Sequence, residues 1–186
     1  MAKRSHSSHT PKPLSTHRPS SALEHKARGP VSIGCGVITC SDSRTPETDT
    51  SGHLIQALLR QQGHLIPIYV VVKDEPEEVR SLLESLGQNP QVGAVIINGG
   101  TGISQRDNTF EAVDGLLEKR LNGFGEIFRY LSYKDIGSSA ILSRATAGLF
   151  KGKVVFSIPG SSGAVRLAME KLILPELPHI VGEMQK

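Results

Sequence analysis

The hydrophobic pattern of the chain alternates between two periods from residue 31 onward. Almost continuous apolar runs, typical of strands that are buried on both faces, occupy residues 33–40, 65–72, 92–98 and 153–158. Apolar residues at helical spacing separate these runs and predict helices over residues 50–62, 75–86, 109–121 and 126–133, with a last helical region after Gly163 that breaks or restarts at Pro175. We therefore predict an α/β fold in which a parallel sheet is wrapped in helices and ligands bind at the carboxyl ends of the strands.

A glycine-rich loop follows the third apolar run. Gly99, Gly100, Thr101 and Gly102 lie between a predicted strand and a predicted helix, and Asp107 comes shortly before that helix. Glycine lets the backbone adopt positive φ and approach a ligand closely, so that successive N–H groups can converge on an anion. For an isolated glycine pair, a connection that serves only the turn is the alternative. Here the strand, the glycines, the acid and the helix agree, which favours a phosphate-binding corner.

The other strand ends also carry polar or glycine-rich loops. Ser41-Asp42-Ser43-Arg44 follows the first strand, Lys73-Asp74-Glu75 the second, and Pro159-Gly160-Ser161 the last. In a parallel sheet these loops lie on the same edge as the Gly99 loop. Two anion-accepting turns and three aspartates on one edge predict a pocket for a phosphorylated ligand with a divalent cation, because Mg²⁺ is typically held by one or two carboxylates plus substrate phosphates.

Helix capping is the structural alternative for some of these acids. Asp74 is followed three residues later by Glu77, which gives a capping-box-like pattern at the start of a helix. Asn108 with Glu111 offers the same pattern for the next helix, and this leaves Asp107 without a capping duty.

Other polar residues have a structural and a functional interpretation as well. Asp49 is expected first to begin a helix and only second to serve a site. Arg129, Ser132 and Arg144 are candidates to contact phosphate, although a lone arginine is more often a surface or ion-pair residue.

Residues 1–30 differ in composition from the rest of the chain. They are rich in Ser, His, Pro and Lys, hold six Lys and Arg against one acid, and have almost no large apolar residues. Such a segment cannot bury enough surface to offset the entropy of ordering, so we predict a disordered basic tail, with an organelle transit peptide as the alternative. Residues 31–186 are then predicted to form one domain.

Charge, hydropathy and cysteine usage narrow the classes of function. Residues 31–186 hold 15 basic and 17 acidic side chains, so the domain has no general attraction for nucleic acid, although the whole chain carries a net charge of +3. No apolar run approaches the ~20 residues that span a bilayer, and the N-terminus lacks the apolar core of a secretion signal. Cys35 and Cys40 are expected to face opposite sides of one strand as buried free thiols, which suits a reducing compartment. We expect a soluble, cytoplasmic protein without membrane or nucleic-acid partners.

With these residues assembled, the chain resembles the MoaB/MogA family of molybdenum cofactor biosynthesis proteins from about Val31 to the C-terminus. The motifs that carry the resemblance are, in the family's order, Ser41-Asp42-Ser43-Arg44, Asp49-Thr50-Ser51-Gly52, Gly99-Gly100-Thr101-Gly102, Arg106-Asp107-Asn108-Thr109-Phe110-Glu111, Gly123-Phe124-Gly125-Glu126, Leu142-Ser143-Arg144 and Pro159-Gly160-Ser161. The resemblance implies a three-layer α/β/α sandwich with a mostly parallel sheet, which assembles as a homotrimer or a homohexamer.

The resemblance also implies an activity and a set of site residues. The implied reaction joins molybdopterin and ATP, with Mg²⁺, to give adenylyl-molybdopterin and pyrophosphate, and prepares the product for a molybdate-inserting enzyme. The family's two important aspartates fall on Asp74 and Asp107, which would be catalytic, with Asp107 also a candidate Mg²⁺ ligand. The family's nearby serine falls on Ser132. The residues implied to bind substrate are Ser41, Asp42, Gly99, Gly100, Thr101, Gly102, Ser132, Pro159, Gly160 and Ser161.

Transfer between phosphates needs positioning and charge neutralisation more than a covalent nucleophile, so the residues suit this chemistry. Two other functions stay open. The first is a non-catalytic molybdopterin-binding or assembly protein that uses the same pocket. The second is a nucleotide pyrophosphatase like the competence-damage (CinA) relatives, against which this chain has Gly-Gly-Thr-Gly and Ser-Asp-Ser-Arg in place of that branch's Gly-Gly-Leu-Gly-Pro-Thr and Gly-Asp-Glu.

Overall fold

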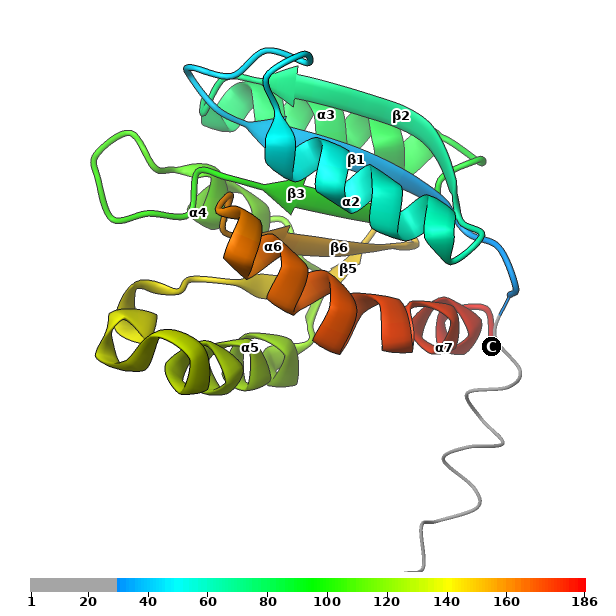
Figure 1. The fold of residues 1–186 in the computed structure, drawn as a ribbon. Coiled ribbons are helices and arrows are strands. Elements are labelled where there is room, and N and C mark those ends of the chain that lie inside the picture. Colours follow the sequence, from blue (N-terminus) through cyan, green and yellow to red (C-terminus); the bar gives the residue numbers. More distant parts are fainter. Residues whose placement is uncertain (1–29) are drawn as a thin grey trace, which may run out of the picture.

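The computed structural model of the chain describes residues 30–186, which contain one six-stranded sheet with the strand order β2-β1-β3-β6-β5-β4 (Figure 1). The strands are β1 (Gly34–Cys40), β2 (Leu65–Val72), β3 (Ala94–Asn98), β4 (Lys119–Arg120), β5 (Thr146–Phe150) and β6 (Lys153–Ile158). The tail predicted over residues 1–30 lies, apart from Pro30, outside the described residues.

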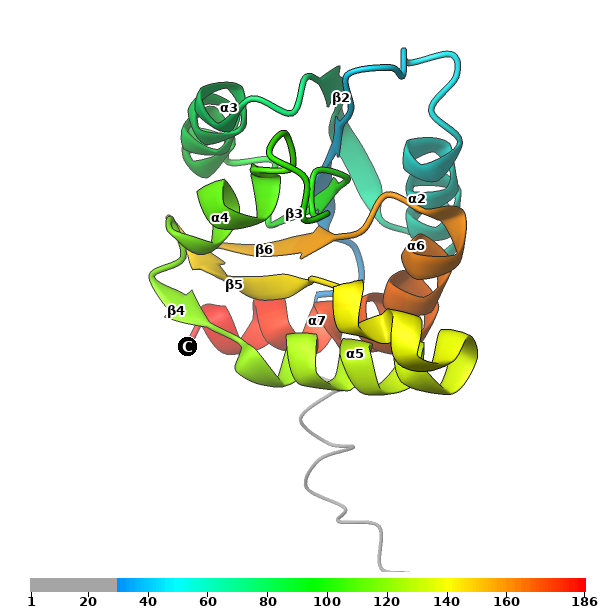
Figure 2. The same cartoon turned by 90° about the vertical axis from the view of Figure 1, so that its left-hand side faces the viewer.

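Helices cover both faces of the sheet and give the predicted three-layer α/β/α sandwich (Figures 1 and 2). One face packs against α2 (Thr50–Gln61), α5 (Asn122–Ile136), α6 (Ser162–Ala168) and α7 (Leu174–Met184). The other face packs against α3 (Pro76–Gln88) and α4 (Thr109–Asp114). The fold class is therefore confirmed.

Alternate side chains of the central strands enter two separate cores, as expected for a sheet that is buried on both faces. On β1, Cys35 and Val37 pack into the core under α2 and α6, whereas Ile38 and Cys40 pack into the core under α3. Cys35 and Cys40 are both buried and free, as predicted. Burial raises the pKa of each thiol to about 12, so both stay protonated at neutral pH.

The sheet is mostly parallel. β1, β2, β3 and β6 run parallel to their neighbours, and β5 pairs antiparallel with β6. Since β1 pairs with β2 on one side and β3 on the other, the order of the strands reverses at β1 and β3, and a crevice at the carboxyl ends of these strands is the usual place for a ligand. Figure 2 looks onto this edge of the sheet.

The helix predicted over residues 109–121 is wrong in its second half. α4 ends at Asp114, and Lys119 and Arg120 form the edge strand β4, which pairs antiparallel with β5. Gly148 permits this pairing, because a Cβ there would come within 2.3 Å of the Lys119 carbonyl oxygen. Arg120 donates to the Asp114 carboxylate at 3.1 Å and holds the turn between α4 and β4.

Strand β5 has no counterpart among the sequence-based predictions. Its residues, Thr146–Phe150, include Ala147 and Gly148 and lack a strong strand signal. The turn after β5 identifies the hairpin more clearly than the strand residues do. Its residues Lys151 and Gly152 have φ of 46° and 70°, and two-residue hairpin turns require such positive values.

The α-helix restarts next to Pro175, in agreement with the prediction of a break or a restart there. α6 leads into the π-helical segment η2 (Met169–Ile173), and α7 begins at Leu174 with Pro175 in its first turn, a position that proline tolerates. Before β5, α5 is followed by a 3-10 helix, η1 (Gly137–Leu142). No helix within residues 30–186 is long and apolar enough to cross a bilayer.

Candidate functional site

The loops that follow β1, β2, β3 and β6 meet around one cavity of about 480 Å³. This confirms the predicted convergence of the strand ends. The predicted residues that line the cavity are Ser41, Asp42, Asp74, Gly99, Gly100, Thr101, Gly102, Asp107, Pro159 and Gly160. We call this space the phosphate cavity.

Two predicted residues lie apart from this group. Ser132 on α5 and Ser161 at the start of α6 line a neighbouring cavity of about 280 Å³. Its walls include the apolar side chains of Ile136 and Leu167. Pro159 and Leu142 line both cavities, so the two spaces are adjacent. We call the smaller space the α5–α6 cavity.

The glycine loop has the backbone geometry that its sequence predicts. Gly99 and Gly100 have φ of 99° and 59°, which disfavours any side chain. A Cβ at Gly99 would also come within 2.1 Å of the Cys40 carbonyl oxygen, and one at Gly100 within 2.5 Å of the Asp74 carboxylate. These glycines therefore bring the β3 end directly against the β1 end and against Asp74.

The prediction that the N–H groups of this loop are available to an anion holds for only some of them. The Gly99 N–H donates to the Ile158 carbonyl at 3.1 Å and is not free for a ligand. Across the described residues, no acceptor takes the N–H of Gly100, Thr101 or Gly102. The anion-binding capacity of the loop therefore starts at Gly100.

Asp74 is a buried carboxylate without a cationic partner in residues 30–186. Its side chain accepts a hydrogen bond from the Thr109 hydroxyl at 2.7 Å, and the residue is only 7% exposed. The capping alternative is wrong, because Glu75 takes the N-cap position of α3 and no side chain caps that helix. Thr109, 35 residues away, holds Asp74 against the glycine loop instead.

Asp107 holds the glycine-rich loop together. Its Oδ2 accepts hydrogen bonds from the Ser104 N–H at 3.1 Å and from the Ser104 hydroxyl at 2.5 Å. Asn108 occupies the N-cap position of α4, as predicted, but its side chain donates to the Gln105 carbonyl and makes no capping hydrogen bond. Asp107 thus has a local structural role that the sequence did not indicate, while its Oδ1 has no donor among the described residues.

A clasp between three charged residues closes the outer rim of the phosphate cavity. The Arg106 guanidinium lies 3.0 Å from carboxylate oxygens of both Asp42 and Glu75. Asp42 also accepts the Asp74 N–H at 3.3 Å. The bond from Arg106, followed by the bond from the Asp74 N–H, lowers the pKa of Asp42, so this carboxylate is ionised at neutral pH.

Arg144 is an ion-pair residue, in line with the structural interpretation. Its two terminal nitrogens donate to the Glu111 carboxylate at 2.6 and 3.0 Å, and Nε donates to the Thr101 carbonyl at 2.9 Å. The guanidinium also stacks over the Phe110 ring at 4.6 Å. Arg144 therefore fixes the far side of the glycine loop and has little capacity left for a phosphate.

A buried network that the sequence did not reveal lies beneath the cavity. Asp49 caps α2 by accepting the Gly52 N–H at 3.0 Å, as predicted, but its carboxylate also accepts hydrogen bonds from Thr39 at 2.5 Å and Tyr69 at 2.9 Å. The same carboxylate pairs with Arg44, which lines the cavity. The position of Arg44, five residues before the predicted helix cap Asp49, was the one feature of the sequence that could have indicated this ion pair.

The residues fit a divalent cation only together with substrate. Among the described residues, no three His, Cys, Asp or Glu side chains come together as metal ligands. Asp74 and the free oxygen of Asp107 provide hard oxygen donors of the kind that Mg²⁺ accepts. Since Mg²⁺ is usually bound by one or two carboxylates plus phosphates, Asp74 and Asp107 would hold it when a nucleotide supplies the remaining ligands.

The ionisation of Asp49 predicts a pH dependence of stability. Burial opposes the charge, but the hydrogen bonds from Thr39, Gly52, Tyr69 and Ser51 outweigh it and lower the pKa of Asp49. A lowered pKa stabilises the folded state above the ordinary carboxyl pKa, and this contribution disappears as the pH falls through the folded-state pKa.

We therefore expect Asp49→Asn to flatten the fall in unfolding free energy between about pH 5 and pH 3, measured by urea denaturation at each pH. Asp42, Glu111 and Asp114, whose pKa values are also lowered, leave a residual slope. An unchanged slope in the variant would show that Asp49 titrates alike in the folded and unfolded chain.

The fold and the cavity define a three-layer α/β protein with a glycine-rich loop and acidic residues at the carboxyl edge of a parallel sheet. A family model described as a probable molybdopterin binding domain matches residues 36–179, and the chain belongs to this family. The molybdenum cofactor biosynthesis protein B of Bacillus subtilis (strain 168) is 54% identical over 167 residues, which cover 89% of this chain and 98% of that protein.

Solved structures agree with this assignment. A crystal structure of a molybdenum cofactor biosynthesis protein B has a TM-score of 0.81 at 54% identity and covers 83% of this chain and 96% of its own. The tungsten cofactor synthesizing protein MoaB from Pyrococcus furiosus has a TM-score of 0.75 at 37% identity and covers 84% of this chain and 99% of its own.

Proposed function

We propose that the protein acts in molybdenum cofactor biosynthesis by binding molybdopterin and adenylylating it with ATP and Mg²⁺. Membership of a family described as molybdopterin-binding supports the substrate, and the names of the relatives support the pathway. The observation that carries the proposal is Asp74, a buried carboxylate without a cationic partner in residues 30–186, which lies against Gly100 of a loop whose N–H groups from Gly100 to Gly102 have no acceptor among these residues. A buried carboxylate without a cation is costly for stability and suits a metal ion, and free N–H groups suit the phosphates that the metal binds.

The proposed reaction balances as follows. A phosphate oxygen of molybdopterin attacks the α-phosphorus of ATP, a new P–O bond forms, and the bond between the α-phosphorus and the bridging oxygen breaks, so that pyrophosphate leaves. Bound Mg²⁺ would neutralise charge on the phosphates. The chain's own residues position the reacting groups: the N–H groups of Gly100, Thr101 and Gly102 hold phosphate oxygens, and Asp74 and Asp107 orient the metal-bound end.

The two adjacent cavities suit the two substrates. The phosphate cavity, with its free N–H groups and acids, takes the triphosphate together with Mg²⁺. The α5–α6 cavity has apolar walls and the buried hydroxyl of Ser132, and it takes the organic part of a substrate. Pro159, which lines both, lies where the two substrates meet.

Chromatography of a mixture of protein, molybdopterin, ATP and Mg²⁺ tests this proposal. We expect adenylyl-molybdopterin and pyrophosphate to form in equal amounts. Molybdopterin binding without pyrophosphate release would instead indicate a non-catalytic binding or assembly protein. Pyrophosphate release from ATP alone would indicate a nucleotide pyrophosphatase. The product is proposed to pass to a molybdate-inserting enzyme in the cytoplasm.

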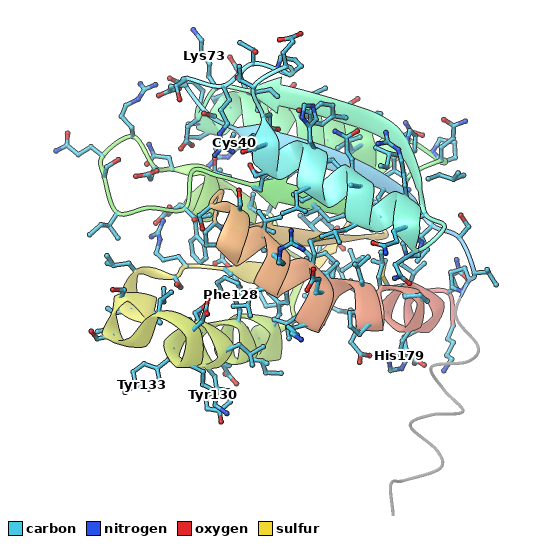
Figure 3. The ribbon with its side chains drawn as sticks, viewed as in Figure 1. Cys40, Lys73, Phe128, Tyr130, Tyr133 and His179 are labelled. Carbon is cyan, nitrogen blue, oxygen red and sulfur yellow. The ribbon has the colours of Figure 1, made fainter. Side chains whose placement is uncertain are left out.

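We also propose that the protein assembles with copies of itself as a homotrimer or homohexamer, as the resemblance implies. An exposed apolar face on α5 and η1 supports this. Figure 3 shows Tyr130 and Tyr133 pointing away from the body of the molecule, whereas Phe128 points inward. The face comprises Ile127, Tyr130, Tyr133, Ile136, Ile141 and Leu142, each at least half exposed.

Light scattering of the full chain at micromolar concentration is expected to give the mass of three or six chains. Tyr133→Glu places a charge on the apolar face and is expected to shift the mass toward one chain, because an unpaired charge in an interface is costly. Tyr133 is 62% exposed in the single chain, so the fold itself should persist. A wild-type monomer would contradict self-assembly, and an unchanged oligomer in the variant would contradict the use of this face.

A further inference from the structure

Two arginines, Arg44 and Arg106, line the phosphate cavity and a third, Arg144, bonds to its lining residue Thr101; the three differ in how much of each guanidinium is already used. Arg144 donates from all three nitrogens to Glu111 and Thr101. Arg106 is held at the exposed rim between two carboxylates. Arg44 pairs with a single carboxylate, lines the cavity and keeps its side chain 30% exposed.

The hydrogen bonds of Arg44 fix its orientation without exhausting its donors. Nη1 donates to Asp49 at 3.3 Å and to the Ser51 hydroxyl, and Nη2 donates to the Gly160 carbonyl at 3.2 Å. A guanidinium has five N–H donors, so Nε–H and one Nη2–H remain. In the part of the chain that the structure describes, no group accepts them.

The network beneath Arg44 makes its position rigid. Asp49 is fully buried and accepts hydrogen bonds from Thr39, Tyr69 and the Gly52 N–H as well as from Arg44. Ser51, which accepts a bond from Arg44, has its single hydroxyl hydrogen within reach of both Asp49, at 3.0 Å, and Asn98 at the end of β3, at 2.9 Å. The guanidinium is therefore anchored to β1, β3 and α2 before any ligand arrives, which reduces the entropy lost on binding.

Gly160 places Arg44 beside the glycine loop. A Cβ at Gly160 would lie 3.1 Å from the Gly99 Cα and 3.9 Å from Arg44 Nη1. The loop with free N–H groups and the guanidinium thus flank the same residue. Backbone N–H groups next to a fixed arginine are a favourable combination for a phosphate, because the guanidinium matches phosphate oxygens in geometry and charge.

We infer that Arg44 binds a phosphate group of the substrates in the phosphate cavity, through Nε–H and the remaining Nη2–H. This inference rests on the proposed function for the identity of the substrates. Its chemistry is shared by two sources, the anhydride phosphates of the nucleotide and the phosphate ester of molybdopterin. In this arrangement Asp74 and Asp107 bind the cation. Arg44 neutralises the negative charge of the phosphates that the cation does not neutralise.

Binding measurements on the full chain test this inference with inorganic pyrophosphate plus Mg²⁺ as one probe and molybdopterin as the other. Arg44→Gln removes the charge, and Arg44→Lys keeps the charge but loses the forked geometry. Tyr69→Phe is the matched control, because it removes one 2.9 Å hydrogen bond of the same network and leaves Arg44 intact. Thermal melting of each variant reports the stability lost with the network.

We expect Arg44→Gln to raise Kd about tenfold or more for at least one probe, as for loss of a charge-assisted hydrogen bond. Arg44→Lys should fall between Arg44→Gln and the wild type, and Tyr69→Phe should bind within about twofold of the wild type while melting earlier. The probe whose affinity falls identifies the phosphate that Arg44 contacts. If Arg44→Gln binds both probes as tightly as Tyr69→Phe, Arg44 has only a structural role and the inference is overturned.

The same measurements separate this inference from the proposed function. A wild-type protein that binds pyrophosphate but forms no adenylyl-molybdopterin contradicts the proposed function, while the Arg44 variants still decide the inference. A protein that forms the product with an Arg44→Gln affinity equal to the wild type contradicts the inference alone. A wild-type protein that binds neither probe contradicts both.

Discussion

Replacing Asp107 with asparagine is expected to lower the rate of adenylyl transfer by about 10²-fold or more, the scale for loss of one preorganised electrostatic contact. The substitution keeps the size of the side chain and one oxygen that can accept the hydrogen bonds from Ser104, which lie at 3.1 and 2.5 Å in the wild type. The loop should therefore keep its shape while the carboxylate charge is lost. Single-turnover rates with molybdopterin and ATP measure the effect directly.

Ser104→Ala is the matched control for Asp107. It removes the hydroxyl that donates to the Asp107 carboxylate and keeps the charge. If Asp107 acts through its charge, the control should lose much less activity than Asp107→Asn. Equal losses in the two variants would mean that Asp107 serves only to shape the loop, and a wild-type rate in Asp107→Asn would remove it from the site.

Asp74→Asn is expected to lower the rate by a similar factor of about 10² without lowering stability. A buried carboxylate that has one hydrogen bond and no cation costs free energy, so the neutral amide should fold at least as well. The amide oxygen can still accept the hydrogen bond from Thr109. Rate and urea denaturation are measured on the same preparation, and a gain in stability together with a loss of rate identifies a residue kept for function.

Thr109→Val provides the comparison for Asp74. It removes the 2.7 Å hydrogen bond and leaves the buried carboxylate without its donor, which is expected to cost about 1–3 kcal/mol of unfolding free energy. If Asp74→Asn is the less stable of the two variants, Asp74 is a structural residue.

The sequence predicted the parallel part of the sheet well, because β1, β3 and β6 are buried and β2, although an edge strand, is also a continuous apolar run. These runs marked β2 and β6 to the residue and placed β1 and β3 within two residues. The convergence of the strand ends followed from parallel topology alone, so the phosphate cavity was predictable before its residues were placed. Ser132 and Ser161 could not be placed in this way, because the neighbouring cavity depends on how α5 packs against α6.

The errors lie where tertiary contacts override local pattern. α4 stops at Asp114 because the following residues pair with β5, whose Gly148 and Ala147 carry almost no strand signal. The capping patterns at Asp74 and Asn108 were local interpretations, whereas the Asp74 side chain bonds to Thr109 from another part of the chain.

The buried network around Asp49 shows the same limit. The helix cap was readable from Asp49 and Gly52, since a cap is local. The bond from Tyr69 to the same carboxylate, and the bond from Arg44 to the Gly160 carbonyl, join segments that only the folded sheet brings together. For this reason the sequence indicated a helix start, and the structure shows an anchor for a cavity-lining arginine.

Transfer of the α-phosphate is the most direct test of the central claim. The wild-type protein is incubated with Mg²⁺, molybdopterin and ATP that carries a radioactive label in the α-phosphate, and the label is followed by chromatography. The account predicts that the label moves onto molybdopterin and that it does so only when Mg²⁺ is present. Asp107→Asn is expected to lower the rate of label transfer by about 10²-fold or more. Label that stays in ATP, or that appears only in free AMP, would contradict the account.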